Sequence, residues 1–144
     1  MAIIKFNNTG VPLKLDKKRD LKRFLASIFV QEGVWLRRLE YIFCDDDYLL
    51  ALNRTYLGHD TYTDIITFTL SEPLAPVTAE IYISTERVFE NARSLGEADY
   101  QELRRVMIHG VLHLCGLGDK TPAAKKVMSA REDHYLAAYV SRET

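Results

Sequence analysis

The sequence predicts one α+β domain, a small mixed sheet of about four strands covered by about five helices. A length of 144 residues and a mass of 16.6 kDa fit a single domain over residues 1–144 rather than two. Short β-prone runs alternate with segments whose apolar residues recur at helical spacing. Two of these runs are joined by only a short Pro-containing connection, which favours an antiparallel pair.

The first half of the chain predicts two strands and two helices. Residues 2–6 are a β-prone run that ends at the turn sequence NNTG of residues 7–10. We expect Asp16 to cap a helix over residues 17–32, because apolar side chains recur there at helical spacing and Gly33 ends the pattern. Residues 35–44 alternate like a strand, and residues 45–47 can cap a second helix that runs to Gly58.

The second half predicts the other strand pair and three helices. Residues 64–70 and 78–84 are rich in β-branched and aromatic residues, so both are expected to be strands. Helical patterns follow over residues 85–95, 99–115 and 122–140. Thr121 is the expected cap of the last helix, with Pro122 at its favoured first position.

Composition excludes several classes of protein. With 47% hydrophobic and 27% charged residues, the chain is not a disordered one, and its apolar runs are far shorter than the ~20 residues of a membrane span. The first ten residues do not resemble a secretory signal, so Cys44 and Cys115 are expected to be buried thiols in a reducing compartment. We therefore expect a cytoplasmic protein that has no membrane partner and needs no organic cofactor.

Residues 99–117 carry the chemistry. From Val106 onward the predicted helix is apolar almost all round, which indicates burial. His109 and His113 are spaced i, i+4, so both imidazoles leave the same face about one turn apart. Gly116 offers a helix C-cap that turns the backbone, and Asp119 follows three residues later. We expect His109, His113 and Asp119 to bind one divalent metal ion.

The spacing H-x3-H-x2-G-x2-D matches the ligand spacing of the metzincin zinc motif. Gly110 stands where that motif has its catalytic Glu, so a zinc peptidase would lack its general base here. The pattern therefore indicates a metal site rather than a protease. His134 is a competing third ligand, although it lies on a different predicted helix, and two ordinary buried histidines are the alternative without a metal.

The residues HGVLHLCG (109–116) followed by Asp119 resemble the H-G-x-L-H-L-x-G-x-D-H signature of the YbeY family of bacterial rRNA maturation factors. The segments NRTYLGHDTYTDIITF (53–68), AEIYIS (79–84) and MSARE (128–132) also resemble family segments, in the same order. The resemblance implies a metal-dependent, single-strand-specific endoribonuclease that acts in rRNA maturation and ribosome quality control. The implied partners are single-stranded RNA, or rRNA, and the small ribosomal subunit.

The sequence departs from the family pattern at two positions. Asp119 occupies the place of the third histidine ligand, and a carboxylate oxygen is an acceptable ligand for Zn²⁺. Leu57 follows Tyr56 where many members have an arginine that contacts substrate, so that role does not transfer to this chain. Arg54 and His59 flank this position and are the candidates for supplying positive charge, as helpers in catalysis.

The expected cofactor is one divalent ion, in the first place Zn²⁺, with Ni²⁺ or Fe²⁺ also compatible with two histidines and an aspartate. Water bound to that ion is the expected catalytic group, because a metal lowers its pKa toward about 7. Glu80, on the preceding strand, is the candidate acceptor for the N–H of a ligand imidazole. The sequence assigns no substrate-binding residue, although Tyr56, Tyr62 and Phe68 lie in a segment where aromatic rings could stack on unpaired bases.

The expectation of an RNA substrate comes from the resemblance, because a formal net charge of −1 gives no general attraction to nucleic acid. Basic residues cluster near the first predicted helix, but such runs usually only solvate a helix face. Two alternatives stay open. The first alternative to the endoribonuclease is a metal-dependent hydrolase of another class, including a peptidase. The second is a non-catalytic ribosome assembly factor with a structural metal.

Overall fold

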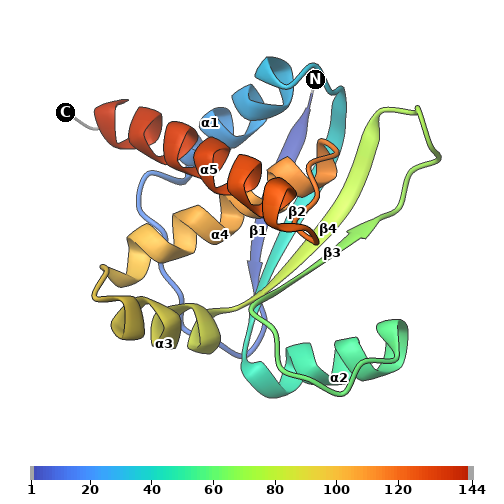
Figure 1. Ribbon diagram of the computed structural model, residues 1–144. Coiled ribbons are helices and arrows are strands. Elements are labelled where there is room, and N and C mark those ends of the chain that lie inside the picture. Colours follow the sequence, from blue (N-terminus) through green and yellow to red (C-terminus); the bar gives the residue numbers. More distant parts are fainter. Residues whose placement is uncertain (1, 143–144) are drawn as a thin grey trace.

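The computed structural model describes residues 2–142, which form one four-stranded sheet with five helices packed around it (Figure 1). The elements in chain order are β1 (Ile3–Asn8), α1 (Lys18–Gln31), β2 (Leu36–Cys44), α2 (Asp46–Leu57), β3 (Ile65–Thr69), β4 (Val77–Ser84), α3 (Thr85–Leu95), α4 (Asp99–Leu114) and α5 (Pro122–Arg142). This architecture confirms the predicted α+β class.

The strand order in the sheet is β1-β2-β4-β3. Strand β2 pairs in parallel with both β1 and β4. Along the chain, α1 connects β1 to β2, whereas α2 and β3 lie between β2 and β4. Strand β3 pairs with β4 antiparallel, with Thr67 opposite Ile81, as the short connection between them predicts. The mixed sheet is therefore confirmed, and β1 runs two residues further than expected, through the NN of the predicted turn.

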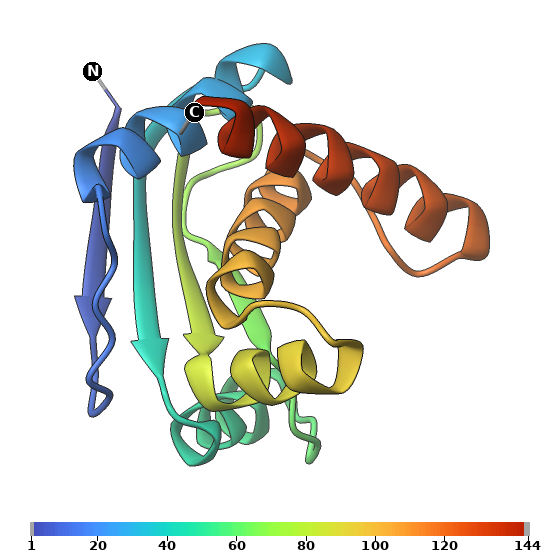
Figure 2. The ribbon, with the colours of Figure 1, turned by 90° about the vertical axis from the view of Figure 1, so that its left-hand side faces the viewer.

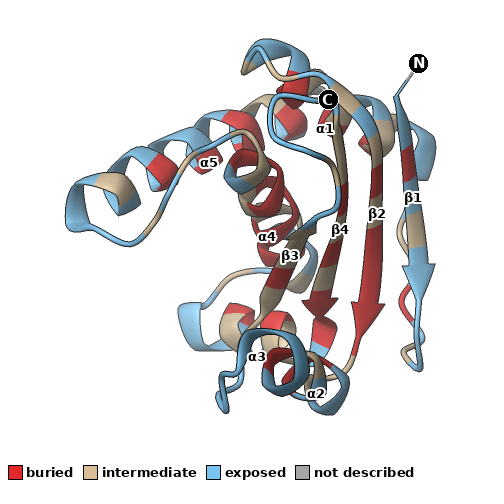
Figure 3. Cartoon of the chain, turned by 90° about the vertical axis from the view of Figure 1, so that its right-hand side faces the viewer, coloured by how far each residue is buried: buried red, intermediate tan, exposed pale blue. Residues whose placement is uncertain are grey.

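One face of the sheet packs against helices α1 and α4, and α5 lies across α4 on the outside (Figure 2). The main core lies in this layer and runs along β2, β4 and α4, where buried residues are concentrated (Figure 3). Helix α2 contacts β3 and β4 and contributes Leu49 to a smaller cluster with Cys44 and Ile66. Among the described residues, no helix is long and apolar enough to cross a membrane.

The helix ends follow the sequence signals with one exception. The Asp45 side chain accepts a hydrogen bond from the backbone N–H of Tyr48 at 2.8 Å, and Thr121 accepts one from Ala124 at 3.0 Å, so both expected caps are confirmed. The expected cap of α1 is wrong. Helix α1 begins after Lys17, which adopts the left-handed conformation at φ 51° and makes no side-chain capping bond.

Gly110 brings α4 very close to the sheet. A Cβ atom at this position would lie 2.8 Å from Cδ1 of Ile81 and 3.1 Å from Cδ1 of Ile65. The side of α4 that carries Gly110 therefore faces the strands. Because side chains one position earlier and three positions later leave the helix in other directions, this docking turns His109 and His113 toward the edge of the sheet.

Both cysteines are free thiols. Cys44 is buried as expected, whereas Cys115 is only half-buried. Burial raises the pKa of each thiol to about 12, so neither is a reactive thiolate near neutral pH.

Candidate metal and catalytic site

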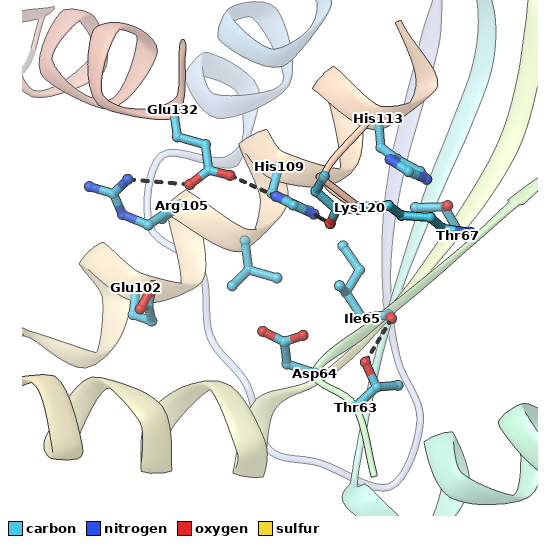
Figure 4. Close-up of a pocket in the computed structure, with 12 residues that line it drawn as sticks. Thr63, Asp64, Ile65, Thr67, Glu102, Arg105, His109, His113, Lys120 and Glu132 are labelled. Atoms are coloured by element: carbon cyan, nitrogen blue, oxygen red, sulfur yellow. Dashed lines mark hydrogen bonds and ion pairs between the residues drawn. The ribbon is translucent and has the colours of Figure 1, made fainter. Parts of the chain in front are cut away.

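A cavity of about 450 Å³ opens between the start of β3, helix α4 and helix α5. Its lining is mostly polar and contains all three of the predicted metal ligands. Figure 4 shows two of them, His109 and His113, among the side chains of the lining. The lining residues are Thr63, Asp64, Ile65, Thr67, Glu102, Arg105, Val106, His109, His113, Asp119, Lys120 and Glu132.

The two histidines project side by side from α4 into this cavity. Their ring centroids are 6.3 Å apart and their planes are inclined by only 7°, as the i, i+4 spacing requires. Buried neighbours such as Met107 and Val111 fix the helix against the sheet, so the direction of the helix face that carries both histidines is set by the core.

His109 is held by a carboxylate on each side. Its Nδ1 lies 2.6 Å from Oε2 of Glu132, and its Nε2 lies 3.4 Å from Oδ2 of Asp119. The hydrogen bond to Glu132 raises the pKa of His109, burial opposes that rise, and the charges of Glu132, Asp119 and Asp64 add to it. In the neutral ring, an Nδ1–H that donates to Glu132 leaves the lone pair on Nε2, the nitrogen nearer to Asp119.

His113 is oriented by the turn that ends the helix. Gly116 has φ +102°, a conformation that suits glycine, and its N–H donates to the carbonyl of His113 at 3.0 Å. The chain then places the carbonyl oxygen of Leu117 3.1 Å from Nδ1 of His113. Since a carbonyl only accepts, Nδ1 of His113 is the donor and Nε2 again carries the lone pair.

These donors fit a divalent ion such as Zn²⁺. Two imidazoles whose Nδ1–H groups are bonded to protein oxygens present Nε2 lone pairs, and Asp119 adds a carboxylate in the same cavity. Within residues 2–142, however, no three side chains of the ligand types already stand in a metal-binding arrangement. The ligand set of His109, His113 and Asp119 therefore stays a prediction.

A charged chain behind His109 was not predicted from the sequence. Arg105 lies one turn before His109 on α4, and its Nη1 is 3.3 Å from Glu132 and its Nη2 2.8 Å from Asp133. Arg105, Glu132 and His109 therefore form a linked series, in which the buried Glu132 bridges the two residues of α4 (Figure 4). The MSARE segment contained Glu132, but only the packing of α5 on α4 reveals its partner.

Two further acids line the cavity. Burial raises the pKa of Asp64, although the charges of His109 and Arg87 oppose the rise. Glu102 is only 6% exposed, and this burial raises the pKa of its carboxyl. The neighbouring charge of Glu97 is the next largest cause of the rise. Asp64 belongs to the segment that resembles the family, whereas no sequence pattern pointed to Glu102.

The expected role of Glu80 is wrong. Ile81 faces α4, so its neighbour Glu80 projects from the opposite side of the sheet. There Glu80 accepts a hydrogen bond from the Tyr82 hydroxyl at 3.2 Å, and the acceptor for the imidazole N–H of His109 is Glu132 instead.

Neither proposed basic helper lines the cavity. Arg54, in the last turn of α2, is ion-paired with Asp60, and the backbone N–H of His59 donates to the carbonyl of Asn53 at 3.2 Å. The cations that do line it are Arg105 and Lys120. His134 packs against the ring of Tyr135, with ring centroids 5.0 Å apart, and also lies outside the cavity lining.

The fold and this cavity define a small α+β domain with a histidine- and carboxylate-lined site at one edge of the sheet. Residues 6–140 match the family model described as endoribonuclease YbeY, and the chain belongs to that family. The endoribonuclease YbeY of Christiangramia forsetii is 42% identical over 127 residues, which are 87% of each chain. That of Porphyromonas gingivalis strain W83 is 41% identical over 144 residues, covering 100% of this chain and 93% of the relative.

A solved structure shares the fold. The solution structure of TM1509 from Thermotoga maritima superposes with a TM-score of 0.64 at 27% sequence identity, over 96% of this chain and 93% of the other. The predicted family resemblance is therefore confirmed by sequence, and the fold by structure.

Proposed function

We propose that this protein is a metal-dependent, single-strand-specific endoribonuclease that acts in rRNA maturation and ribosome quality control in the cytoplasm. Its membership of the endoribonuclease YbeY family supports the reaction class and an RNA substrate. The observation that carries the metal dependence is the pair of imidazoles in one cavity with both Nδ1 atoms bonded to protein oxygens. The small ribosomal subunit is the proposed partner.

His109, His113 and Asp119 are the proposed ligands of the ion, with Zn²⁺ the first candidate and Ni²⁺ or Fe²⁺ the others. When bound, such an ion polarises a phosphoryl oxygen and lowers the pKa of water toward about 7. Glu132 holds the proton of His109 on Nδ1 and so keeps Nε2 available, while the carbonyl of Leu117 does the same for His113.

The cations of the cavity suit a phosphodiester. Lys120 follows Asp119 directly and lines the cavity, so its ammonium group is placed to pair with a phosphate oxygen. Arg105 is already paired with Glu132 and Asp133, and its role is to position Glu132 behind His109. Among the residues that the structure describes, the lining thereby combines a held pair of imidazoles with Lys120, for which no ion pair is found.

The peptidase alternative is disfavoured by the geometry of α4. The position that carries the general base in the metzincin motif is Gly110, which is not part of the cavity lining and whose Cβ would lie 2.8 Å from Cδ1 of the buried Ile81. A carboxylate there would be directed into the core. The experiment below distinguishes the other alternative, a non-catalytic assembly factor with a structural metal, from the proposed ribonuclease.

The decisive experiment compares His113→Ala with His134→Ala, a matched change in a histidine outside the cavity lining. We expect the wild type and His134→Ala to contain one equivalent of metal and to cut single-stranded RNA in preference to a duplex. We expect His113→Ala to lose both metal and cleavage while keeping its circular dichroism spectrum and melting temperature. Cleavage that survives removal of all metal would overturn the proposal.

Unfolding of His113→Ala on loss of the metal would instead support the structural ion. The ends of the RNA products add mechanistic information, because a 2′,3′-cyclic phosphate excludes direct attack by water in the cleaving step. For the role in rRNA maturation, we expect precursor rRNA to accumulate in cells without this protein. Wild-type protein should reverse that accumulation and His113→Ala should not.

A further inference from the structure

Tyr62 is an exposed aromatic residue that directly precedes two cavity-lining residues in the chain. It lies in the loop between α2 and β3, and the two residues that follow it, Thr63 and Asp64, both line the cavity. Tyr62 is 53% exposed. Of the exposed aromatic residues in the described chain, it alone stands directly next to a lining residue in the sequence.

Arg87, in the first turn of α3, holds this ring in place. Its guanidinium carbon lies 5.0 Å from the centroid of the Tyr62 ring. The guanidinium is itself fixed by Asp46, with Nη2 at 2.6 Å from Oδ2 and Nε at 3.4 Å from Oδ1. The Ser84 hydroxyl donates to the same carboxylate at 2.7 Å, so Tyr62 is supported on a fixed arrangement of charged and polar groups.

The Tyr62–Arg87 pair is linked to the candidate site through Asp64. Asp64 lines the cavity, and its backbone carbonyl accepts a hydrogen bond from the N–H of Ser84 at 3.0 Å, the residue whose hydroxyl donates to the carboxylate that holds Arg87. Three other exposed aromatic residues pack against rings outside the cavity lining: Tyr48 on Tyr82, Tyr56 on Phe68 and Tyr100 on Phe89. Tyr48 stacks on Tyr82, with centroids 6.3 Å apart, on the side of the sheet away from α4.

We propose that the Tyr62 ring, supported by Arg87, stacks on an unpaired base of the RNA strand next to the phosphodiester that enters the cavity. The proposal rests on the proposed ribonuclease function and adds the feature by which a single strand is selected. A base in a duplex has its faces covered by its neighbours, whereas an unpaired base offers a free face to an aromatic ring. Tyr62 is thus a substrate-binding residue.

The test measures binding of a fluorescein-labelled, unstructured single-stranded RNA by fluorescence anisotropy, with chelator present to prevent turnover. The variants are Tyr62→Ala, Tyr62→Phe and Trp35→Ala, the last removing an aromatic that is 81% exposed and outside the cavity lining. We expect Tyr62→Ala to weaken binding about tenfold, the usual effect of losing one stacked base. Tyr62→Phe and Trp35→Ala should stay within about twofold of the wild type.

A second series of RNAs, each with one abasic nucleotide, separates stacking from a structural role. At one position, removing the base should weaken binding to the wild type as much as Tyr62→Ala does. The same removal should cost Tyr62→Ala nothing further, because the two changes delete one interaction. Melting temperatures of all variants should agree with that of the wild type.

Three outcomes would overturn the proposal. If the wild type binds RNA and Tyr62→Ala binds it equally well, stacking fails while the ribonuclease function stands. If Tyr62→Ala lowers the melting temperature and weakens binding to every abasic RNA alike, Tyr62 has a structural role only. If the wild type neither binds nor cleaves RNA, the proposed function fails and this inference fails with it.

Discussion

The Nδ1 atom of His109 lies 2.6 Å from a carboxylate oxygen of Glu132, a residue of the last helix that stands 23 positions later in the chain. This contact fixes the ring and selects the nitrogen that carries the proton. The orientation and the protonated nitrogen of His109, a predicted ligand on α4, therefore depend on a carboxylate that α5 supplies.

Glu132→Gln should weaken metal binding about 10- to 100-fold. The glutamine amide keeps a hydrogen-bond acceptor for Nδ1–H of His109 but lacks the negative charge that makes Nε2 a more basic metal ligand. Competition with a chromophoric chelator measures the affinity. Asp133→Asn is the matched control, since Asp133 also pairs with Arg105 but makes no contact with His109. Equal affinities for the two variants would show that the His109–Glu132 contact does not support the metal site.

Gly110→Glu should lower the free energy of unfolding by about 3 kcal/mol or more, because it forces a charged side chain between α4 and the buried Ile81. Urea denaturation gives the difference. Gly118→Glu introduces the same side chain where nothing lies within 4 Å of the new Cβ, and it should change stability by less than about 0.5 kcal/mol. Two equally stable variants would contradict the close approach of α4 to the sheet.

Tyr41→Phe should destabilise the protein by about 1 kcal/mol, because the fully buried hydroxyl donates to the carbonyl of Met107 at 2.8 Å and ties β2 to α4. Tyr48→Phe removes a hydroxyl from a residue that is 40% exposed and should cost less than about 0.5 kcal/mol. The midpoint of urea unfolding measures both. A cost for Tyr41→Phe no larger than that control would mean that the bond adds nothing to stability.

Cys44 should make the folded state lose stability in alkaline solution. Burial in the first place, with the charges of Asp45 and Asp46, raises the pKa of its thiol from 9.0 to about 12. Below pH 9 the thiol is neutral in both states, so its contribution is fully present there. Between the two values the unfolded chain ionises and the folded protein does not, so stability falls by about 1.4 kcal/mol per pH unit.

The measurement is the slope of unfolding free energy against pH, for the wild type and for Cys44→Ser. The serine hydroxyl does not titrate in this range and can donate to the carbonyl of Ile83, as the thiol does at 3.5 Å. We expect the wild-type slope above pH 9 to be steeper than that of the variant. Parallel slopes would show that Cys44 ionises as easily in the folded protein as in the unfolded chain.

Local patterns predicted most of the fold. Helix α3 has the expected bounds, the expected caps Asp45 and Thr121 make their bonds, and the short connection gave the antiparallel β3–β4 pair. The prediction that Asp16 caps α1 is wrong because of the backbone conformation of the next residue. Lys17 has a left-handed backbone conformation that residues other than glycine seldom adopt, and no propensity rule anticipates it.

The site was predictable only where its residues lie on one helix and the turn after it. The i, i+4 spacing brought His109 and His113 together, and the Gly116 turn accounts for Asp119 in the same cavity. Glu132 depends on how α5 packs across α4, which periodicity does not encode. For Glu80 a usable signal was present, because strand alternation with Ile81 already placed it on the other side of the sheet.

Helix α5 is anchored by Arg131, whose guanidinium lies 2.6 Å from Glu32, and by the Tyr135 hydroxyl, which bonds the same carboxylate. Since that helix brings Glu132 to His109, the order of synthesis matters. All four strands and both histidines precede Glu132 in the chain, so they are synthesised before it. In newly made protein, the contact between Glu132 and His109 therefore forms only after α5 has been translated and has docked on Glu32.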